Sequence, residues 1–241
     1  MTKMKYRKEI EKIENFIRER TGNLDGGIIG LSGGIDSTII AYLSVRALGK
    51  AKVYGLIMPY DSQSVEDGEL VAKELGIDYD IVNIKPVVDS FEEQAKYFDK
   101  DLSKGNLMAR VRMCLLYGAA NNKNRLVLGT TNKSEMEIGY FTKHGDGAVD
   151  IEPIAHLYKT EVWEMAEELG IPEQLITKAP SAELWDGQTD ENELGFNYHT
   201  LDKILQGETE GIEQKVLERV ENLRKGSWHK KKMPDRLEVE E

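Results

Sequence analysis

Cysteine is almost absent from this sequence: Cys114 is the single one in 241 residues. One thiol excludes an internal disulfide and any metal site built from several cysteines. Because Cys114 lies in an apolar helical stretch, residues 113–116, we expect it to be a small core residue.

Long apolar runs are also missing. None approaches the roughly 18 apolar residues that a membrane-spanning helix needs. The basic N-terminus, residues 1–8, is followed by glutamates and not by the apolar core of a signal peptide. These absences predict a cytoplasmic protein with no membrane partner.

Positive charge is in short supply, with 32 Lys and Arg against 43 Asp and Glu and a formal net charge of -11. A field of that sign repels nucleic acid, whose binding depends on neutralising phosphates, so we expect no nucleic-acid partner. It repels nucleotides as well, so a nucleotide enzyme of this charge has to gather cations locally. Arg110 with Arg112, and the run 229–232, are two clusters that can do so.

Internal repeats and low-complexity linkers are absent, which predicts a single domain over residues 1–241. Short apolar runs predict strands at 26–31, 52–58, 78–84 and 125–130. Helical patterns predict helices at 4–20, 36–48, 64–76 with Ser64 as N-cap, and 86–122. This alternation favours an α/β fold: an open parallel sheet with helices on both faces, whose ligands lie beyond the carboxyl ends of the strands.

The second half of the chain has a different pattern. Residues 139–150 are rich in Gly, Asp and Lys and predict a mobile loop, whereas 158–169 predict a helix. Residues 177–190 show neither period, 190–224 predict two short C-terminal helices, and 226–241 form a charged tail.

The most informative motif lies between the first predicted strand and its helix. It reads Leu31-Ser32-Gly33-Gly34-Ile35-Asp36-Ser37, and we call it the phosphate loop. Its glycines let the backbone approach a phosphate, its serines add hydroxyl donors, and the following helix points free N–H groups at the same place. Asp36 repels phosphate, so we assign it to Mg²⁺, which binds carboxylate and phosphate oxygens together.

The phosphate loop differs from two common nucleotide motifs, because it has neither the lysine of GxxxxGK[ST] nor the spacing of GxGxxG. SGGxDS after a strand resembles the pyrophosphate loop of the N-type ATP pyrophosphatases. The resemblance implies the Rossmann-like fold of the adenine nucleotide alpha-hydrolases. It also implies cleavage of ATP between the α and β phosphates, with transfer of AMP to a substrate oxygen. A glycine-rich turn that merely caps a helix is the alternative.

Further segments resemble the NAD synthetases within that superfamily. They are KGNLMARVRM (104–113), LGTTNKSE (128–135), GYFTKHGDG (139–147), DIEPI (150–154), LYKT (157–160), PSAELW (180–185), GQTDE (187–191) and the pair His229-Lys230. The resemblance runs from about residue 26 to 232. The chain departs from the family at Thr131-Asn132, where many members have Asp-His, and at Ser181, where some have Thr.

The resemblance is to the ammonia-dependent members, because the first strand near residue 26 leaves room for only one helix and no glutaminase domain before it. Such enzymes amidate deamido-NAD (nicotinic acid adenine dinucleotide) in the last step of NAD biosynthesis. ATP and the nicotinate carboxylate give an acyl-adenylate and pyrophosphate, and ammonia then gives NAD and AMP. The resemblance also implies Mg²⁺ as cofactor and a homodimer that binds deamido-NAD at its interface.

The resemblance assigns roles to individual residues. Asp36 and Glu135 are the implied Mg²⁺ ligands, and Asp36, Lys159 and Ser181 the implied catalytic residues. ATP binding is implied for the phosphate loop, Thr130, Lys159 and Ser181. Deamido-NAD binding is implied for Arg110, Lys143, Asp150, His229 and Lys230.

Several alternatives stay open. Arg112 is the alternative to Arg110, because residues two apart on a helix face different directions. Gly145 and Gly147 are expected to let the loop 139–150 order on binding. The structural alternatives are that Glu135 is a solvated helix residue, that Lys159 is a surface lysine and that the pair His229-Lys230 belongs to a disordered tail.

Two other functions compete with this one. A tRNA-modifying pyrophosphatase fits poorly, because thiolating members need catalytic cysteines and tRNA favours a basic surface. A non-catalytic nucleotide-binding module has no need of separated carboxylates together with lysines.

Overall fold

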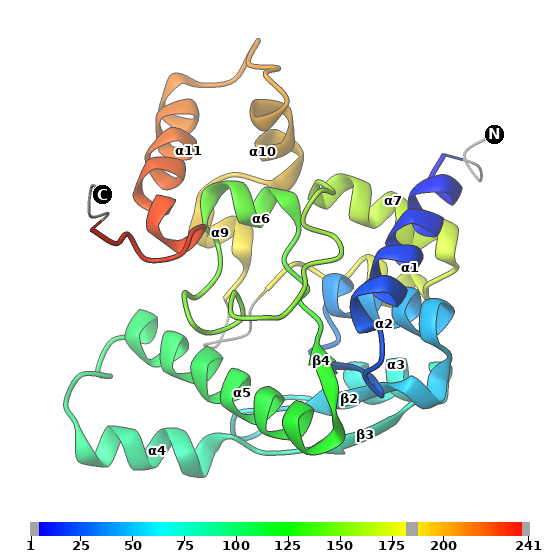
Figure 1. Cartoon of the computed structure of the whole chain (residues 1–241). Coiled ribbons are helices and arrows are strands. Elements are labelled where there is room, and N and C mark those ends of the chain that lie inside the picture. Colours follow the sequence, from blue (N-terminus) through cyan, green and yellow to red (C-terminus); the bar gives the residue numbers. More distant parts are fainter. Residues whose placement is uncertain (1–4, 182–187, 238–241) are drawn as a thin grey trace.

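A computed structural model describes residues 5–181 and 188–237 of the chain. In this part of the chain, four parallel strands form one sheet in the order β3-β2-β1-β4 (Figure 1). Their bounds are β1 Gly26–Gly30, β2 Val53–Ile57, β3 Asp78–Ile81 and β4 Arg125–Val127. The predicted fold class is confirmed, and the strand order reverses between β1 and β4, where open α/β sheets bind their ligands.

Helices cover both faces of the sheet (Figure 1). On one face lie α2 (Ile35–Leu48) and α3 (Glu66–Leu75), with α1 (Arg7–Thr21) and α7 (Lys159–Leu169) packed on α2. On the other lies α5 (Asp101–Lys123), with α4 (Lys85–Gln94) beside it. Successive strand residues point to opposite faces, so Ile28 and Ile29, both 0% exposed, belong to separate hydrophobic cores.

A third core lies beyond the carboxyl edge of the sheet. It joins α6 (Lys133–Ile138), α9 (Asp190–Leu194), α10 (Tyr198–Leu205) and α11 (Gln214–Gly226), which gather at the top of Figure 1. The remaining short elements are η2 (Lys50–Lys52), α8 (Glu173–Ile176) and η3 (Trp228–Lys230). Within the described ranges, no helix combines the length and the apolar character needed to cross a membrane.

Several predicted boundaries are wrong. The third strand ends at Ile81, three residues earlier than predicted. The helical stretch predicted over roughly 86–122 consists of two helices, with residues 95–100 between them. Residues 190–224 hold three described helices where two were predicted. The helix predicted at 64–76 starts at Glu66 with Val65 as its N-cap, although Ser64 Oγ accepts a hydrogen bond from the Glu66 N–H at 3.2 Å.

Cys114 is exposed, so its prediction as a core residue is also wrong. The apolar stretch 113–116 turns around α5 by a full helical turn, and the sheet can cover only one side of it. Met113 and Leu116 are buried there, whereas Cys114 faces outward.

Candidate active site

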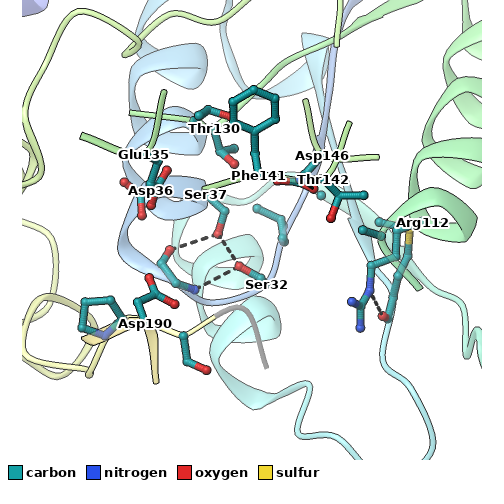
Figure 2. Close-up of a pocket in the computed structure, with 18 of the residues that line it drawn as sticks. Ser32, Asp36, Ser37, Arg112, Thr130, Glu135, Phe141, Thr142, Asp146 and Asp190 are labelled. Carbon is teal, nitrogen blue, oxygen red and sulfur yellow. Dashed lines mark hydrogen bonds between the residues drawn. The ribbon is translucent and has the colours of Figure 1, made fainter. Parts of the chain in front are cut away.

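The phosphate loop connects β1 to α2 at the carboxyl edge of the sheet. Gly33 has φ +77°, a conformation that residues with a side chain rarely adopt, and a methyl group there would lie 2.3 Å from Asp67 Cβ. Ser32 Oγ accepts from the Gly34 N–H at 3.2 Å and lies 3.1 Å from Ser37 Oγ (Figure 2). These bonds fix the loop before any ligand binds, with the N-terminal N–H groups of α2 directed at the pocket.

Asp36, Glu135 and Lys159 meet beside the phosphate loop. Lys159 is 2% exposed, and its ammonium donates to Asp36 and, at 3.4 Å, to Glu135 Oε1. Figure 2 shows the carboxylates of Asp36 and Glu135 close together. Lys159 is the first residue of α7, where the helix dipole disfavours a cation, so the two carboxylates must compensate.

Asn132 sets the position of both carboxylates. Its side chain caps α6 by accepting from the Glu135 N–H at 3.0 Å, and Glu135 Oε2 accepts from the Asn132 N–H at 3.1 Å. Asn132 Nδ2 then donates to Asp36 Oδ1 at 3.0 Å. A residue that departs from the common family pattern therefore connects the two expected metal ligands.

The charges of this cluster do not balance. Burial raises the pKa of Glu135 to about 8, and the Asp36 carboxylate adds to that rise. Burial alone would lower the pKa of Lys159, but Asp36 and Glu135 raise it above its ordinary value. Asp190 faces the same cluster, and burial raises its pKa too. One lysine faces three carboxylates, so the cluster has an excess of negative charge that a further cation can neutralise.

Two tyrosines of the third core support the cluster, Tyr198 buried and Tyr140 partly buried. Tyr198, 0% exposed, donates to Asp190 Oδ2 at 2.9 Å and lies 3.5 Å from Glu135 Oε1. Tyr140 donates to Glu193 Oε2 at 2.9 Å and to Asp190 Oδ1 at 3.3 Å. Sequence reasoning gave no role to these residues, although Asp190 and Tyr140 lie in segments that resemble the family.

A cavity of about 610 Å³ opens over the cluster and the phosphate loop. Its polar end is the site just described, and its other end is apolar, with Leu56, Met58, Met113, Leu116 and Val149 in its wall. Arg112 stands on the side away from Asp36 (Figure 2). It donates to the Met58 carbonyl at 3.0 Å and to Gln63 Oε1 at 3.0 Å, which ties α5 to the loop after β2.

The cavity gathers most of the residues expected to bind ATP. Those in its wall are Leu31, Ser32, Gly34, Ile35, Asp36, Ser37, Thr130, Lys159 and Ser181. The wall also contains the expected metal ligand Glu135 and, from the expected deamido-NAD set, Lys230. Arg112 belongs to the wall and Arg110 does not. Ser181 Oγ donates to the Gln188 carbonyl at 2.7 Å. The matched residues 182–185 and 187 lie outside the described residues.

Four residues of the expected deamido-NAD set lie together at the loop 139–150: Arg110, Lys143, His229 and Lys230. Arg110 donates to the Lys143 carbonyl at 3.2 and 3.3 Å, and Lys143 Nζ donates to the His229 carbonyl at 2.7 Å. Lys230 Nζ donates to the carbonyls of Gly139 and Phe141, at 2.8 Å each, and its burial lowers its pKa. This part of the tail is therefore folded onto the loop.

Asp150 is separate from that group. Its carboxylate accepts from Tyr117 Oη at 3.0 Å and from the Val127 N–H at 2.7 Å, which joins the end of the loop to α5 and β4. Close packing also explains why residues 145 and 147 of the loop are glycines. A methyl group at Gly147 would lie 2.4 Å from the Phe141 ring, and one at Gly145 would lie 2.9 Å from Thr142, so close packing requires both glycines.

Glu152 lies behind the pocket wall and is partly buried. Its Oε2 accepts from the Thr131 N–H at 3.1 Å, while its buried Oε1 has no hydrogen-bond partner among the described residues. Burial raises its pKa to about 8. A methyl group at Gly129 would lie 2.3 Å from Oε2, so this glycine makes room for the carboxyl group at the end of β4.

The comparisons with known proteins agree with one another. The family model described as NAD synthase matches residues 9–234. The NH(3)-dependent NAD(+) synthetase of Pyrococcus horikoshii is 52% identical over 95% of this chain and 93% of its own length. NMN synthetase from Francisella tularensis has a TM-score of 0.90 at 38% identity, covering 96% of this chain and 98% of that structure. NH3-dependent NAD synthetase from Campylobacter jejuni, in complex with the nitrate ion, has a TM-score of 0.83 at 33% identity, covering 98% of this chain and 100% of that structure.

Proposed function

Since this chain belongs to the NAD synthase family, we propose that it is an ammonia-dependent NAD synthetase, a ligase that amidates deamido-NAD at the cost of ATP. The observation that carries the proposal is the Asp36–Glu135–Lys159 cluster, with its lysine buried, beside a preformed phosphate loop in one cavity. The tRNA-modifying enzyme and the plain binding module, which remained open from the sequence, do not fit this family.

In the proposed reaction, the nicotinate carboxylate attacks the α phosphorus of ATP and pyrophosphate leaves. This step needs neutralisation of charge more than acid–base chemistry. The phosphate loop, with Thr130, Lys159 and Ser181, is proposed to hold ATP. Lys159 is oriented by its two carboxylates, so its ammonium is already in place when the nucleotide enters.

Asp36 and Glu135 are the residues proposed to hold Mg²⁺. Among the described residues no three His, Cys, Asp or Glu side chains form a metal-binding group. Two carboxylates still fit this ion, which usually keeps several waters and binds through one or two carboxylates plus substrate phosphates. When bound, Mg²⁺ would neutralise the charge on the phosphate oxygens.

Ammonia must lose a proton when it attacks the acyl-adenylate, because the product is a neutral amide. We propose Asp190 as the acceptor of that proton. It lines the cavity, its pKa is raised by burial, and Tyr140 and Tyr198 fix both of its oxygens. A carboxylate whose pKa is raised toward neutral is a better base than an ordinary one.

Arg110, Lys143, Asp150, His229 and Lys230 are proposed to bind deamido-NAD. Most of them lie outside the cavity, as expected if a partner subunit completes this part of the site. Apolar side chains exposed on and around α4 and α5 support a homodimer: Val87 is 44%, Phe91 48%, Tyr97 79% and Leu102 65% exposed. Light scattering that shows an active monomer at working concentration would exclude the dimer.

A pyrophosphate-release assay tests the function. With ATP, Mg²⁺ and ammonium, we expect deamido-NAD to be turned over and to yield NAD, and glutamine to be inert as nitrogen source. The likeness to an NMN synthetase makes the acid form of nicotinamide mononucleotide the competing substrate. A higher kcat/KM for the mononucleotide would mean that the mononucleotide, and not deamido-NAD, is the substrate. Absence of pyrophosphate release with both compounds would refute the ligase activity.

A further inference from the structure

Asp202 is a buried carboxylate on α10, outside the cavity. It is 2% exposed and does not belong to the cavity wall, so a substrate in the cavity does not touch it. Helix α10 packs against both α6, which carries Glu135, and α7, which begins with Lys159. A carboxylate at this depth is stable only where hydrogen-bond donors and positive charge surround it, so its partners indicate its role.

Both carboxylate oxygens of Asp202 are used to hold the start of α7. Oδ2 accepts from the Thr160 N–H at 3.0 Å. Oδ1 accepts from the Ser134 hydroxyl, and Ser134 Oγ in turn accepts from the Lys159 N–H at 2.9 Å. A hydroxyl has one proton to donate, and here it goes to Asp202, while a lone pair of the same oxygen receives the Lys159 N–H. Asp202 therefore satisfies the first two N–H groups of α7, one directly and one through Ser134.

This arrangement attaches the main chain of Lys159 to the helix that carries one of its carboxylate partners. Ser134 and Glu135 are consecutive residues of α6. The hydroxyl that accepts from the Lys159 N–H is therefore next in sequence to the carboxylate that accepts, at 3.4 Å, from the Lys159 ammonium. Lys159 is bonded to α6 at both ends, and its buried side chain has little freedom to place the ammonium elsewhere.

The charge of Asp202 matters to the ammonium as well. Lys159 is the first residue of α7, where the positive end of the helix dipole opposes a cation. Asp202 places a negative charge at the same helix end, in contact with its N–H groups. The helix end is thus offset by a carboxylate outside the cavity wall, while Asp36 and Glu135, within the wall, pair with the ammonium.

We propose that Asp202 is a positioning residue for Lys159. Through the first two N–H groups of α7 it holds the Lys159 ammonium between Asp36 and Glu135, ready for the nucleotide. It forms no bond to substrate and takes part in no proton transfer. The inference rests on the proposed function only for the statement that Lys159 binds ATP. The competing view is that Asp202 only joins α10 to its two neighbouring helices.

The first test observes the Lys159 ammonium directly, by ¹⁵N NMR of the lysine-labelled protein without ATP or Mg²⁺. Lys159→Met identifies its signal. Asp202→Asn keeps the shape of the side chain and an oxygen for the Thr160 N–H, but it removes the charge. The Lys159 signal should shift, and its ammonium protons should exchange with water roughly 3- to 30-fold faster, the range for losing a favourable charge at a helix end. An unchanged Lys159 signal would overturn the proposal.

Asn197→Ala is the matched control for stability. Asn197 is the N-cap of α10 and accepts from the Thr200 N–H at 2.8 Å, so its loss weakens the same helix at a different point. Urea unfolding compares the stability of the two variants, and Asn197→Ala should leave the Lys159 signal in place. Equal shifts in both variants would mean a structural role and overturn the proposal. Should Asp202→Asn fail to fold, Ser134→Ala, which removes the hydroxyl between Asp202 and Lys159, is judged by the same criterion.

The second test is calorimetric titration of Mg²⁺-ATP. Removing a negative charge by itself strengthens the binding of an anion, whereas a misplaced Lys159 weakens it, so the sign of the change separates the two effects. Asp202→Asn should weaken ATP binding roughly 3- to 30-fold and have no further effect in the Lys159→Met background. Stronger binding, or additive losses in the double variant, would overturn the proposal. The NMR test needs no ATP, so a Lys159 signal that responds in a protein without pyrophosphate release would support this inference and refute the proposed function.

Discussion

Replacing Glu152 by Gln should make the protein more stable at alkaline pH. The native carboxyl group has a pKa of about 8 in the folded chain against 4.5 for an ordinary glutamate. Between these values the folded protein keeps the proton and the unfolded chain releases it. The free energy of unfolding therefore falls as pH rises, by about 1.4 kcal/mol per pH unit.

Over the whole window the loss is about 5 kcal/mol, the product of the pKa difference and that slope. This value is a ceiling, because water that reaches the carboxylate in a relaxed native state reduces it. Gln keeps an oxygen to accept from the Thr131 N–H, and its amide group has the shape of the protonated carboxyl group. The two proteins should thus be equally stable near pH 4.5 and diverge above it.

The assay is urea unfolding from pH 5 to pH 9 without ATP or Mg²⁺. Subtracting the two curves removes the contribution of Glu135, whose pKa is also raised, because both proteins contain it. Glu208→Gln, at an exposed position, controls for the loss of one negative charge from the whole protein. Parallel stability curves for the native protein and Glu152→Gln would refute the reasoning.

Three further changes probe the site. Asp36→Asn should lower the rate of pyrophosphate release on the order of a hundredfold or more, while its melting temperature stays within a few degrees of native. Near-native turnover at saturating Mg²⁺ would exclude Asp36 as a metal ligand. Lys159→Met removes the positive charge that neutralises Asp36 and Glu135. It should lower the free energy of unfolding of the metal-free protein by about 3 kcal/mol or more in urea at pH 9. An unchanged urea midpoint would mean that the lysine does not stabilise the cluster. Gly33→Ala meets both the positive φ and Asp67, so calorimetry should show at least about tenfold weaker ATP binding, and native affinity would contradict the close packing of α3 on the loop.

The sheet and the phosphate loop could be predicted because their signals are local. A strand such as Gly26–Gly30 is a short apolar run, and the glycines and serines that follow it are adjacent in sequence. Boundaries were less accurate where tertiary packing decides them, as at the break between α4 and α5. Cys114 shows the same limit, because an apolar run on a helix does not indicate which side meets the sheet.

The network around the predicted catalytic residues could not be predicted. Tyr198 meets Glu135 across 63 positions and Lys178 meets Asp67 across 111, and no periodicity connects residues so far apart. The sequence also did not indicate that Arg112 lies in the cavity wall and Arg110 outside it, and the assignment of Arg110 to the substrate stays a prediction. Asp190 lay within a recognised segment, but only its burial beside Lys159 indicates a chemical role.

Within the described part of the chain, main-chain carbonyls accept the bonds by which Arg110, Lys143 and Lys230 join the loop 139–150 to α5 and to the C-terminal tail. Arg110 reaches the carbonyl of residue 143, Lys143 that of residue 229, and Lys230 those of residues 139 and 141. Every amino acid offers the same carbonyl, so the bond to residue 229 does not depend on the His229 imidazole, whereas Lys143 is also a donor and Gly139, at φ +67°, has no space for a side chain. The loop and the tail therefore stay joined when the side chain of residue 229 changes.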